Sequence, residues 1–235
     1  LRLLKRELSP RGELSGNITL MGKDRSELSH RESAEKIGFV MQNPDSQTVC
    51  DKVSAELAFG LESFGVKSGE IQSRVGEMAA FFGIEPLYDR DISTLSGGQK
   101  QLVALCSVMV TDPDILLLDE PTAQLDPVAA RELLGILDRL NKEMGVTIII
   151  AEHDPEELFD SCDKILYLAK GKTEFFGTPD LTAKYFVENA LEGFLPETAK
   201  AFAGLCDDLP LNVRQGRAKL EKLGVSDIPK QAVTD

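Results

Sequence analysis

Two adjacent carboxylates near the middle of the chain have the residue types and the spacing for phosphate chemistry. Asp119 and Glu120 directly follow the aliphatic run Ile115–Leu118. Such a run is typical of a parallel strand buried on both faces, which delivers the next residues to the sheet edge where ligands bind. One carboxylate there can hold Mg²⁺, and its neighbour can orient or deprotonate an attacking water. The alternative is a capped turn before Pro121.

A possible anion site precedes this strand. Ser96, Gly97 and Gly98 would open a helix, where a hydroxyl, bare backbone N–H groups and the helix dipole together attract phosphate. Alone, the triplet is usually a flexible turn.

Polar residues also follow two other predicted strands. Gln42 follows the segment Ile37–Met41, and His153 comes shortly after Val146–Ala151. Without further context the glutamine is typical of a turn and the histidine of a structural side chain.

The elements that position these residues occur in a characteristic order. Leu95–Gln99 precedes a helix over about 97–110, the strand with Asp119 and Glu120 follows, and Ala123–Asp126 comes next. This order resembles the nucleotide-binding domain of ATP-binding cassette (ABC) ATPases, in which these segments are the signature motif, Walker B and the D-loop. The resemblance implies a P-loop NTPase-like α/β fold with a mainly parallel sheet, a helical subdomain and a C-terminal helical extension. It implies an ATPase domain over 1–180, with the helical subdomain at about 50–112, and the extension over 181–235.

The resemblance also implies ATP and Mg²⁺ as cofactors. Glu120 would be the general base, His153 would contact the γ-phosphate, and Gln42 would reach Mg²⁺ and the attacking water. Asp119 would hold Mg²⁺. The signature residues Ser96, Gly97, Gly98 and Gln99 would bind the nucleotide of a second ATPase subunit, and Asp126 of the D-loop would communicate across that interface.

The family's Walker A motif, Gly-x-x-x-x-Gly-Lys-Ser/Thr, would lie just before Leu1 and is not found in the printed sequence. Gly171-Lys172-Thr173 has the right ending, but Leu166 stands where the first glycine is required. Strand-like segments flank it, which predicts a hairpin turn. The printed chain is therefore expected to be inactive alone.

One segment is similar to a narrower group, the ATPases of energy-coupling factor transporters, which import vitamins or cobalt and nickel ions. It reads Gln42-Asn43-Pro44-Asp45-Ser46-Gln47, with Glu56–Gly60 shortly after. The resemblance implies an ATPase at the cytoplasmic face of the cell membrane, paired with an identical or related ATPase and with integral membrane subunits. Leu102 departs from the pattern, because many ABC ATPases have arginine there.

Composition limits the alternatives. A chain of 235 residues with 42% hydrophobic residues can bury a core. The net charge of −13 argues against nucleic acid as the main partner. The four cysteines lie far apart without a Cys-x-x-Cys pair, which disfavours zinc and suits reduced thiols. No apolar run approaches the roughly 18 residues of a spanning helix.

Three other functions stay open. The chain could serve another importer or an exporter. It could be a non-transport ABC protein acting in DNA repair or on ribosomes, although the coiled-coil insertions, zinc cysteines and basic linkers of those proteins are not seen. It could also be an inactive interaction subunit if Walker A is truly absent, but Asp119, Glu120 and His153 argue against that.

Overall fold

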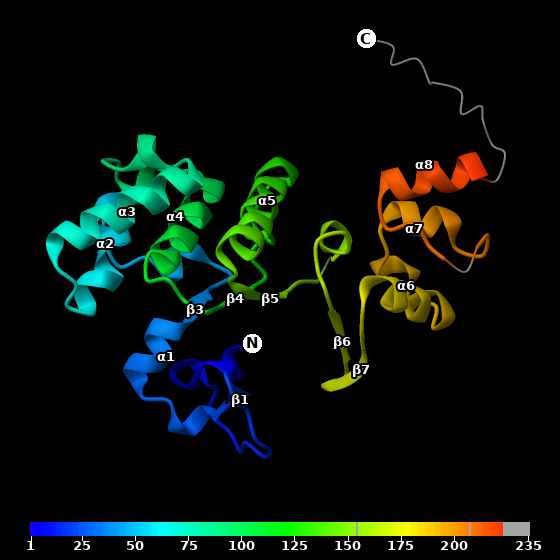
Figure 1. The fold of residues 1–235 in the computed structure, drawn as a ribbon, viewed down its shortest axis with the longest axis horizontal. Coiled ribbons are helices and arrows are strands. Elements are labelled where there is room, and N and C mark those ends of the chain that lie inside the picture. The colour runs from blue at the N-terminus through cyan, green and yellow to red at the C-terminus, as the bar shows by residue number, and fades with distance from the viewer. Residues whose placement is uncertain (154, 207, 223–235) are drawn as a thin grey trace, which may run out of the picture. The chain divides into compact units, whose positions relative to one another are not determined.

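The computed structural model describes residues 1–153, 155–206 and 208–222, which fall into two compact units (Figure 1). The first unit is Leu1–His153 and the second is Asp154–Asp235. This division differs from the domain boundary predicted at residue 180. A hairpin before that residue joins the second unit because Tyr167 and Phe175 pack against Tyr185, with ring centroids 6.4 and 4.5 Å apart. The boundary between family domains stays a prediction.

The centre of the first unit is a parallel sheet of three strands in the order β3-β4-β5. These strands are Ile37–Val40, Ile115–Asp119 and Thr147–Ala151. β4 lies between the other two, and its three leucines, Leu116–Leu118, have no exposed surface. This confirms the predicted buried parallel strand that ends in a carboxylate.

Alternate residues of β4 contribute to two different parts of the core. Leu116 and Leu118 belong to a cluster formed with the helices α2 (Val53–Ser63), α3 (Ser68–Phe82), α4 (Gly97–Met109) and α5 (Pro127–Met144). Leu117 belongs to a second cluster formed with the N-terminal segment. This alternation follows from the period of two along a strand and places helices over one face of the sheet.

Local sequence signals set the helix boundaries. Ser96 caps α4, and Asp126 caps α5 with Pro127 at its first position. Gly83 and Gly145 end α3 and α5 with φ of 66° and 73°, a conformation that glycine adopts without strain. Short 3₁₀ turns connect the elements at Arg25–Glu27, Pro44–Ser46, Glu85–Leu87, Ile92–Thr94 and Glu192–Phe194.

The N-terminal segment differs from the helix that leucine spacing predicts over Leu1–Leu8. It forms two 3₁₀ turns, Arg2–Leu4 and Arg6–Leu8, separated by the extended residue Lys5. The backbone breaks at Lys5, whose ammonium donates to the carbonyl of Ile37 on β3. A hairpin of β1 (Thr19–Leu20) and β2 (Lys23–Asp24) follows, and then α1 (His30–Lys36).

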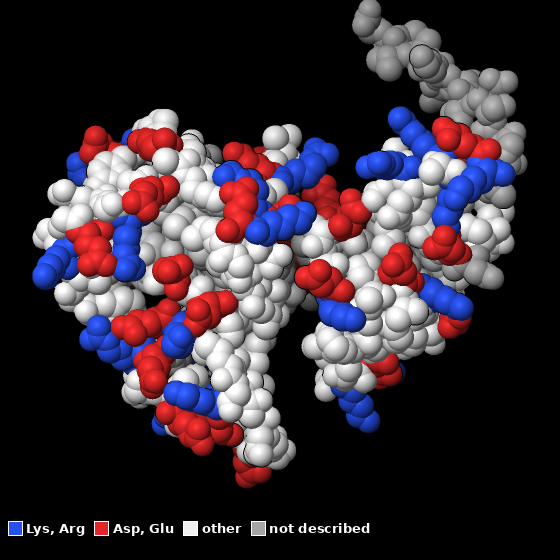
Figure 2. Space-filling view, viewed as in Figure 1, with Lys and Arg blue, Asp and Glu red and all other residues white. Residues whose placement is uncertain are grey.

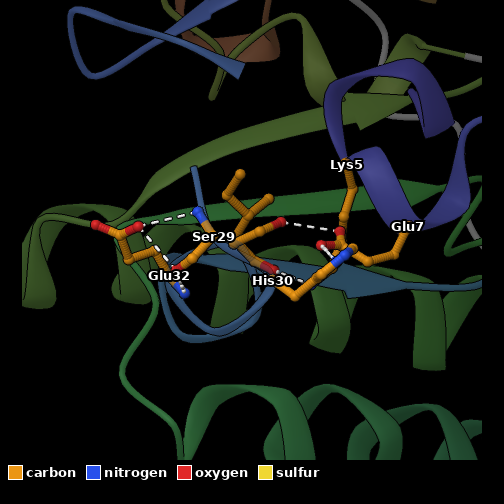
Figure 3. A network of polar contacts seen from close by, with 7 residues as sticks. Lys5, Glu7, Ser29, His30 and Glu32 are labelled. Atoms are coloured by element: carbon orange, nitrogen blue, oxygen red, sulfur yellow. Dashed lines mark hydrogen bonds and ion pairs between the residues drawn. The ribbon is translucent and has the colours of Figure 1, made fainter. Parts of the chain in front are cut away.

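Polar contacts attach these turns to α1 (Figure 3). Glu7 accepts a hydrogen bond from the Ser33 hydroxyl at 2.9 Å and contacts His30 Nδ1 at 3.1 Å. Ser29 and Glu32 form a reciprocal capping box at the start of α1. Burial raises the pKa of Glu7, but hydrogen bonds from its backbone, Ser33 and His30 outweigh burial and hold the pKa below its ordinary value of 4.5.

This lowered pKa predicts acid sensitivity. A carboxyl whose pKa is depressed by folding stabilises the protein above its unfolded pKa, and that stabilisation disappears as pH falls through the folded pKa. We expect the urea midpoint to decrease between about pH 5 and about pH 3, and we expect Glu7→Gln to flatten part of that decrease. Glu13→Gln, at an exposed position, is the matched control. Identical profiles for Glu7→Gln and wild type would contradict the assignment.

Gly38 of β3 packs directly against α4, so a larger residue should destabilise the first unit. A Cβ built there would lie 2.5 Å from Val108 Cγ1, 3.2 Å from Leu116 Cδ1 and 3.3 Å from Pro113 Cγ. Valine is stiff at χ1 and cannot easily move aside. We expect Gly38→Ala to lower the free energy of unfolding by about 1–3 kcal/mol in urea titrations.

Gly135 provides the opposite control. It lies within α5, and nothing lies within 4 Å of the Cβ that alanine would add. We expect Gly135→Ala to stabilise the protein by up to about 1 kcal/mol because alanine favours the helix. Equal effects of the two substitutions would refute the packing argument.

The second unit combines a hairpin with short helices. β6 (Ile165–Ala169) and β7 (Lys172–Gly177) are antiparallel, and Lys170 and Gly171 form the turn with φ of 50° and 75°. This confirms that Gly171-Lys172-Thr173 belongs to a hairpin. The helices are α6 (Pro179–Glu188), α7 (Glu197–Phe202) and α8 (Val213–Lys222).

Two details of this unit differ from what the sequence predicts. Pro155, with Asp154 and Glu157 spaced as a capping box, predicts the start of a helix. The structure has a 3₁₀ turn at Glu156–Leu158 instead, and Asp154 lies outside the described residues. Leu205, expected among the apolar contacts of the tail, is 70% exposed, whereas Ala199 and Phe202 are buried.

All four cysteines are unpaired, and burial raises the pKa of Cys106 strongly and that of Cys162 to about 11. On the face drawn in Figure 2, acidic and basic side chains are interspersed over each unit. Within the described residues, no helix is both long and apolar enough to cross a bilayer.

Candidate active site

Strand register brings three polar residues to one edge of the sheet. Val40 pairs with Leu118, and Leu118 pairs with Ile150. The three parallel strands therefore end at the same level, and Gln42, Glu120 and His153 follow them there.

Glu120 lies at the centre of this group. Gln42 Nε2 donates a hydrogen bond to Glu120 Oε2 at 2.7 Å, and His153 Nε2 lies 2.7 Å from Glu120 Oε1. Both carboxylate oxygens are thus in contact with a neighbouring side chain. The Glu120 side chain is 24% exposed and that of His153 is 88% exposed. The arrangement holds one carboxylate in a fixed position, open to solvent from the histidine side.

The backbone at Glu120 is unusual. Its φ is +50°, a left-handed conformation that costs most residues about 1–3 kcal/mol. Its N–H donates to the carbonyl of Ala151 at 2.9 Å, and its carbonyl accepts from the N–H of Ala123 at 3.3 Å. This turn directs the side chain away from the strand line and toward Gln42 and His153.

Asp119 is the last residue of β4 and has a separate environment. Its Oδ2 lies 3.7 Å from Arg2 Nε, and its side chain is 28% exposed. A carboxylate that already attracts a guanidinium at a strand end is chemically suited to a hard cation such as Mg²⁺. The described residues hold no cluster of three or more His, Cys, Asp or Glu that could form a complete metal cage. Mg²⁺ normally needs only one or two carboxylates beside phosphates and water.

The signature residues form the start of α4. The Ser96 N–H donates to Gln99 Oε1 at 3.0 Å, and the Gln99 N–H donates to the Ser96 hydroxyl at 3.3 Å. Gly98 approaches α5 closely, because a Cβ there would lie 3.1 Å from that of Ala129. A groove of about 330 Å³ opens beside these residues, lined by α4, α5 and the segment at the end of α3.

Within the described part of the chain, no hydrogen bond or ion pair joins the signature residues to Glu120. Lys100, the next residue after the signature motif, has its ammonium 2.7 Å from Asp45 Oδ1. Asp45 lies in the 3₁₀ turn Pro44–Ser46, which closely follows Gln42. Sequence reasoning did not single out this pair, and Lys100 next to the signature motif was the available signal.

Asp126 caps its own helix. Its carboxylate accepts hydrogen bonds from the N–H groups of Val128 and Ala129 at 2.9 and 3.1 Å. The bonds from Ala129 and Val128 hold the pKa of Asp126 below its usual value. The role in communication between subunits stays a prediction.

A further contact lies beside Glu120 and was also missed. Glu152 Oε1 accepts hydrogen bonds from the Thr122 N–H at 3.0 Å and from the Thr122 hydroxyl at 2.7 Å. In the sequence, the feature that could have indicated this contact is a hydroxyl shortly after one predicted strand and a carboxylate directly after the next.

Solved structures show where this arrangement recurs. A structure of cbiO1 from Clostridium perfringens, described as part of the ABC transporter complex cbiONQ, matches with a TM-score of 0.68 and 34% identity over 81% of this chain and 76% of that one. The ATP-binding cassette MJ0796, described as a dimer in a post-hydrolysis state bound to ADP and Pi, matches with a TM-score of 0.60 and 25% identity over 70% and 74%. The fold is therefore that of the ABC ATPases, within the P-loop NTPase class.

Sequence comparison gives the family. The family model described as ABC transporter matches residues 1–123. A provisionally named ABC transporter ATP-binding protein of Bacillus thuringiensis is 40% identical over 222 residues, which are 94% of this chain and 40% of that protein. One from Methanosarcina acetivorans is 32% identical over 91% of this chain and 67% of its own length. The chain belongs to the ABC transporter family. It spans less than half the length of the Bacillus relatives.

Proposed function

We propose that this chain is the ATP-hydrolysing subunit of an ABC importer of the energy-coupling factor type, with Glu120 as the general base. The observation that carries the proposal is the position of Glu120, 2.7 Å from both Gln42 Nε2 and His153 Nε2. A carboxylate held in this way is suited to orient a water and to accept its proton.

In the proposed reaction, water attacks the γ-phosphorus of ATP. The new O–P bond forms as the bond to the bridging β,γ-oxygen breaks, Glu120 takes the water proton, and ADP and phosphate leave. Gln42 would position the water, and His153 would contact the γ-phosphate. Phosphoryl transfer depends mainly on positioning and charge neutralisation, which is what these side chains supply.

Asp119 and the Gln42 amide oxygen are the groups that would hold Mg²⁺. Both are hard oxygen ligands of the kind that this ion prefers. Bound Mg²⁺ supplies neutralisation of phosphate charge. Asp119 and Gln42 would orient the phosphates relative to Glu120.

The proposed active unit contains two ATPase subunits. Ser96, Gly97, Gly98 and Gln99 would contact the nucleotide of the partner, since a helix start with glycines accepts phosphate closely. The similarity to the dimeric cassette MJ0796 supports this pairing of two ATPase subunits. The similarity to cbiO1, a part of the cbiONQ transporter complex, supports an assembly with integral membrane subunits at the cytoplasmic face of the membrane. That nucleic acid is not a partner remains a prediction, based on the net charge of −13.

The test uses the full gene product, with whatever residues precede Leu1. Intact mass and peptide mapping establish whether a Gly-x-x-x-x-Gly-Lys-Ser/Thr segment is present. We expect phosphate release from ATP whose rate per subunit rises with protein concentration, because two subunits complete each site. If the full gene product contains the Gly-x-x-x-x-Gly-Lys-Ser/Thr segment and still does not bind ATP, the proposal is contradicted.

The importer class needs a separate measurement. In cells lacking the gene, we expect loss of uptake of one solute among labelled vitamins, cobalt and nickel, with the other solutes unaffected. Unchanged uptake of all of them, together with normal ATP hydrolysis by the purified protein, would retain the ATPase and reject the energy-coupling factor assignment.

A further inference from the structure

Glu152 connects the ends of two neighbouring strands. It is the first residue after β5, and both hydrogen bonds from Thr122 end on its Oε1, at 3.0 Å from the backbone N–H and 2.7 Å from the hydroxyl. Thr122 lies 30 positions earlier, in the turn after β4. Both residues are half-buried. One carboxylate oxygen therefore fixes a backbone group and a side chain of the turn that begins with Glu120.

A second contact runs parallel to the first. The Glu120 N–H donates to the carbonyl of Ala151, directly before Glu152, at 2.9 Å. Glu120 thus lies in a short loop that is held to the end of β5 at two points, its own N–H and Thr122. Because its φ of +50° is unfavourable for a residue with a side chain, the surroundings must maintain that conformation.

His153 depends on the same attachment. Its ring is 88% exposed and lies 2.7 Å from Glu120 Oε1. An exposed ring has few packing contacts to fix it, so its position relative to Glu120 is set largely by its backbone. That backbone follows Glu152 directly.

We infer that Glu152 and Thr122 are positioning residues that hold His153 against Glu120. They act through the backbone next to the pair, with Thr122 two residues after Glu120 and Glu152 directly before His153, and they do not themselves contact the Glu120 side chain. Their consequence for catalysis rests on the proposed function, whereas their effect on the His153 ring does not.

Suitable substitutions distinguish the effect of the hydrogen bonds between Thr122 and Glu152 from the effect of the negative charge of Glu152. Both hydrogen bonds reach a single oxygen, so Glu152→Gln retains an acceptor that Glu152→Ala removes, although both variants lose the same charge. Thr122→Ser retains the hydroxyl, and Thr122→Val removes it without any change in charge. Glu143→Ala removes an exposed carboxylate from α5 and is the matched control.

The readout is the NMR signal of the His153 ring. The printed sequence has two histidines, His30 and His153. Histidine labelled with ¹³C at Cε1 alone gives one ring signal per histidine, and the signal that disappears in His153→Gln belongs to His153. His30 contacts Glu7 and serves as the internal reference. We expect Glu152→Ala and Thr122→Val to shift and broaden the His153 signal alone. Thr122→Ser should match wild type, and Glu152→Gln should lie closer to wild type than Glu152→Ala does.

Activity of the full gene product gives a second readout. We expect kcat for ATP hydrolysis to fall about ten- to a hundred-fold in Glu152→Ala, with KM for ATP nearly unchanged, because misplacement by about an ångström has effects of this size. Glu152→Gln should recover most of the lost rate.

The outcomes separate this inference from the proposed function. A shifted His153 signal in a gene product that never hydrolyses ATP would uphold the positioning role and reject the proposed activity. An unchanged His153 signal in Glu152→Ala and Thr122→Val, with a lower unfolding midpoint, would make the contact purely structural and overturn the inference. Thr122→Val is the milder substitution and decides the question if Glu152→Ala does not fold.

Discussion

Replacing Glu120 with glutamine is expected to reduce ATP turnover by about two to four orders of magnitude while ATP-driven dimerisation stays intact. Glutamine has the same shape and retains an oxygen for the hydrogen bond from Gln42, so the local fold should persist. It cannot accept a proton from water at neutral pH, and proton transfer is the step that the proposed mechanism assigns to Glu120.

The measurement combines phosphate release with size-exclusion chromatography in the presence of ATP, using the full gene product. Glu143→Gln is the control, because Glu143 forms an exposed ion pair with Arg139 on α5 at 3.2 Å. Wild-type turnover in Glu120→Gln would reject Glu120 as the general base. Loss of dimerisation with unchanged turnover per dimer would indicate a role in assembly instead.

Replacing Leu118 with alanine is expected to lower the free energy of unfolding by about 2–5 kcal/mol. Leu118 has no exposed surface and lies in the central strand, where it contributes to the cluster beneath the helices. Removing its side chain leaves a cavity that a parallel sheet paired on both sides of β4 cannot readily close. Such a loss is a large part of the stability of an ordinary domain.

Urea unfolding followed by circular dichroism measures this effect. Leu14→Ala, at a position 53% exposed in the same unit, is the control and should change stability by no more than about 0.5 kcal/mol. If the two alanine variants unfold at the same urea concentration, the assignment of Leu118 to the central core is wrong.

The sequence by itself determined the central strand of the first unit and the starts of two of its helices. The run Ile115–Leu118 is apolar at every position, which is typical of a strand buried on both faces. Ser96 and Asp126 stand where helices need capping groups, and both perform that role. These features depend on neighbours in sequence, which is why local patterns predict them.

Local patterns were less reliable where distant contacts compete. The leucine spacing of the first eight residues predicts a helix, but Lys5 is drawn to the carbonyl of Ile37, and two 3₁₀ turns result. The grouping of the hairpin with the second unit depends on ring contacts between Tyr167, Phe175 and Tyr185. Neither outcome is encoded in periodicity.

The candidate site shows the same division. Sequence order placed Gln42, Glu120 and His153 after successive strands, but only the parallel register brought Glu120 to 2.7 Å from both of the others. The contact of Glu152 with Thr122 joins positions 30 apart and has no local pattern that would reveal it. Residue types thus determined which chemistry is available, and tertiary structure decided which side chains meet, because register and packing join residues that are distant along the chain.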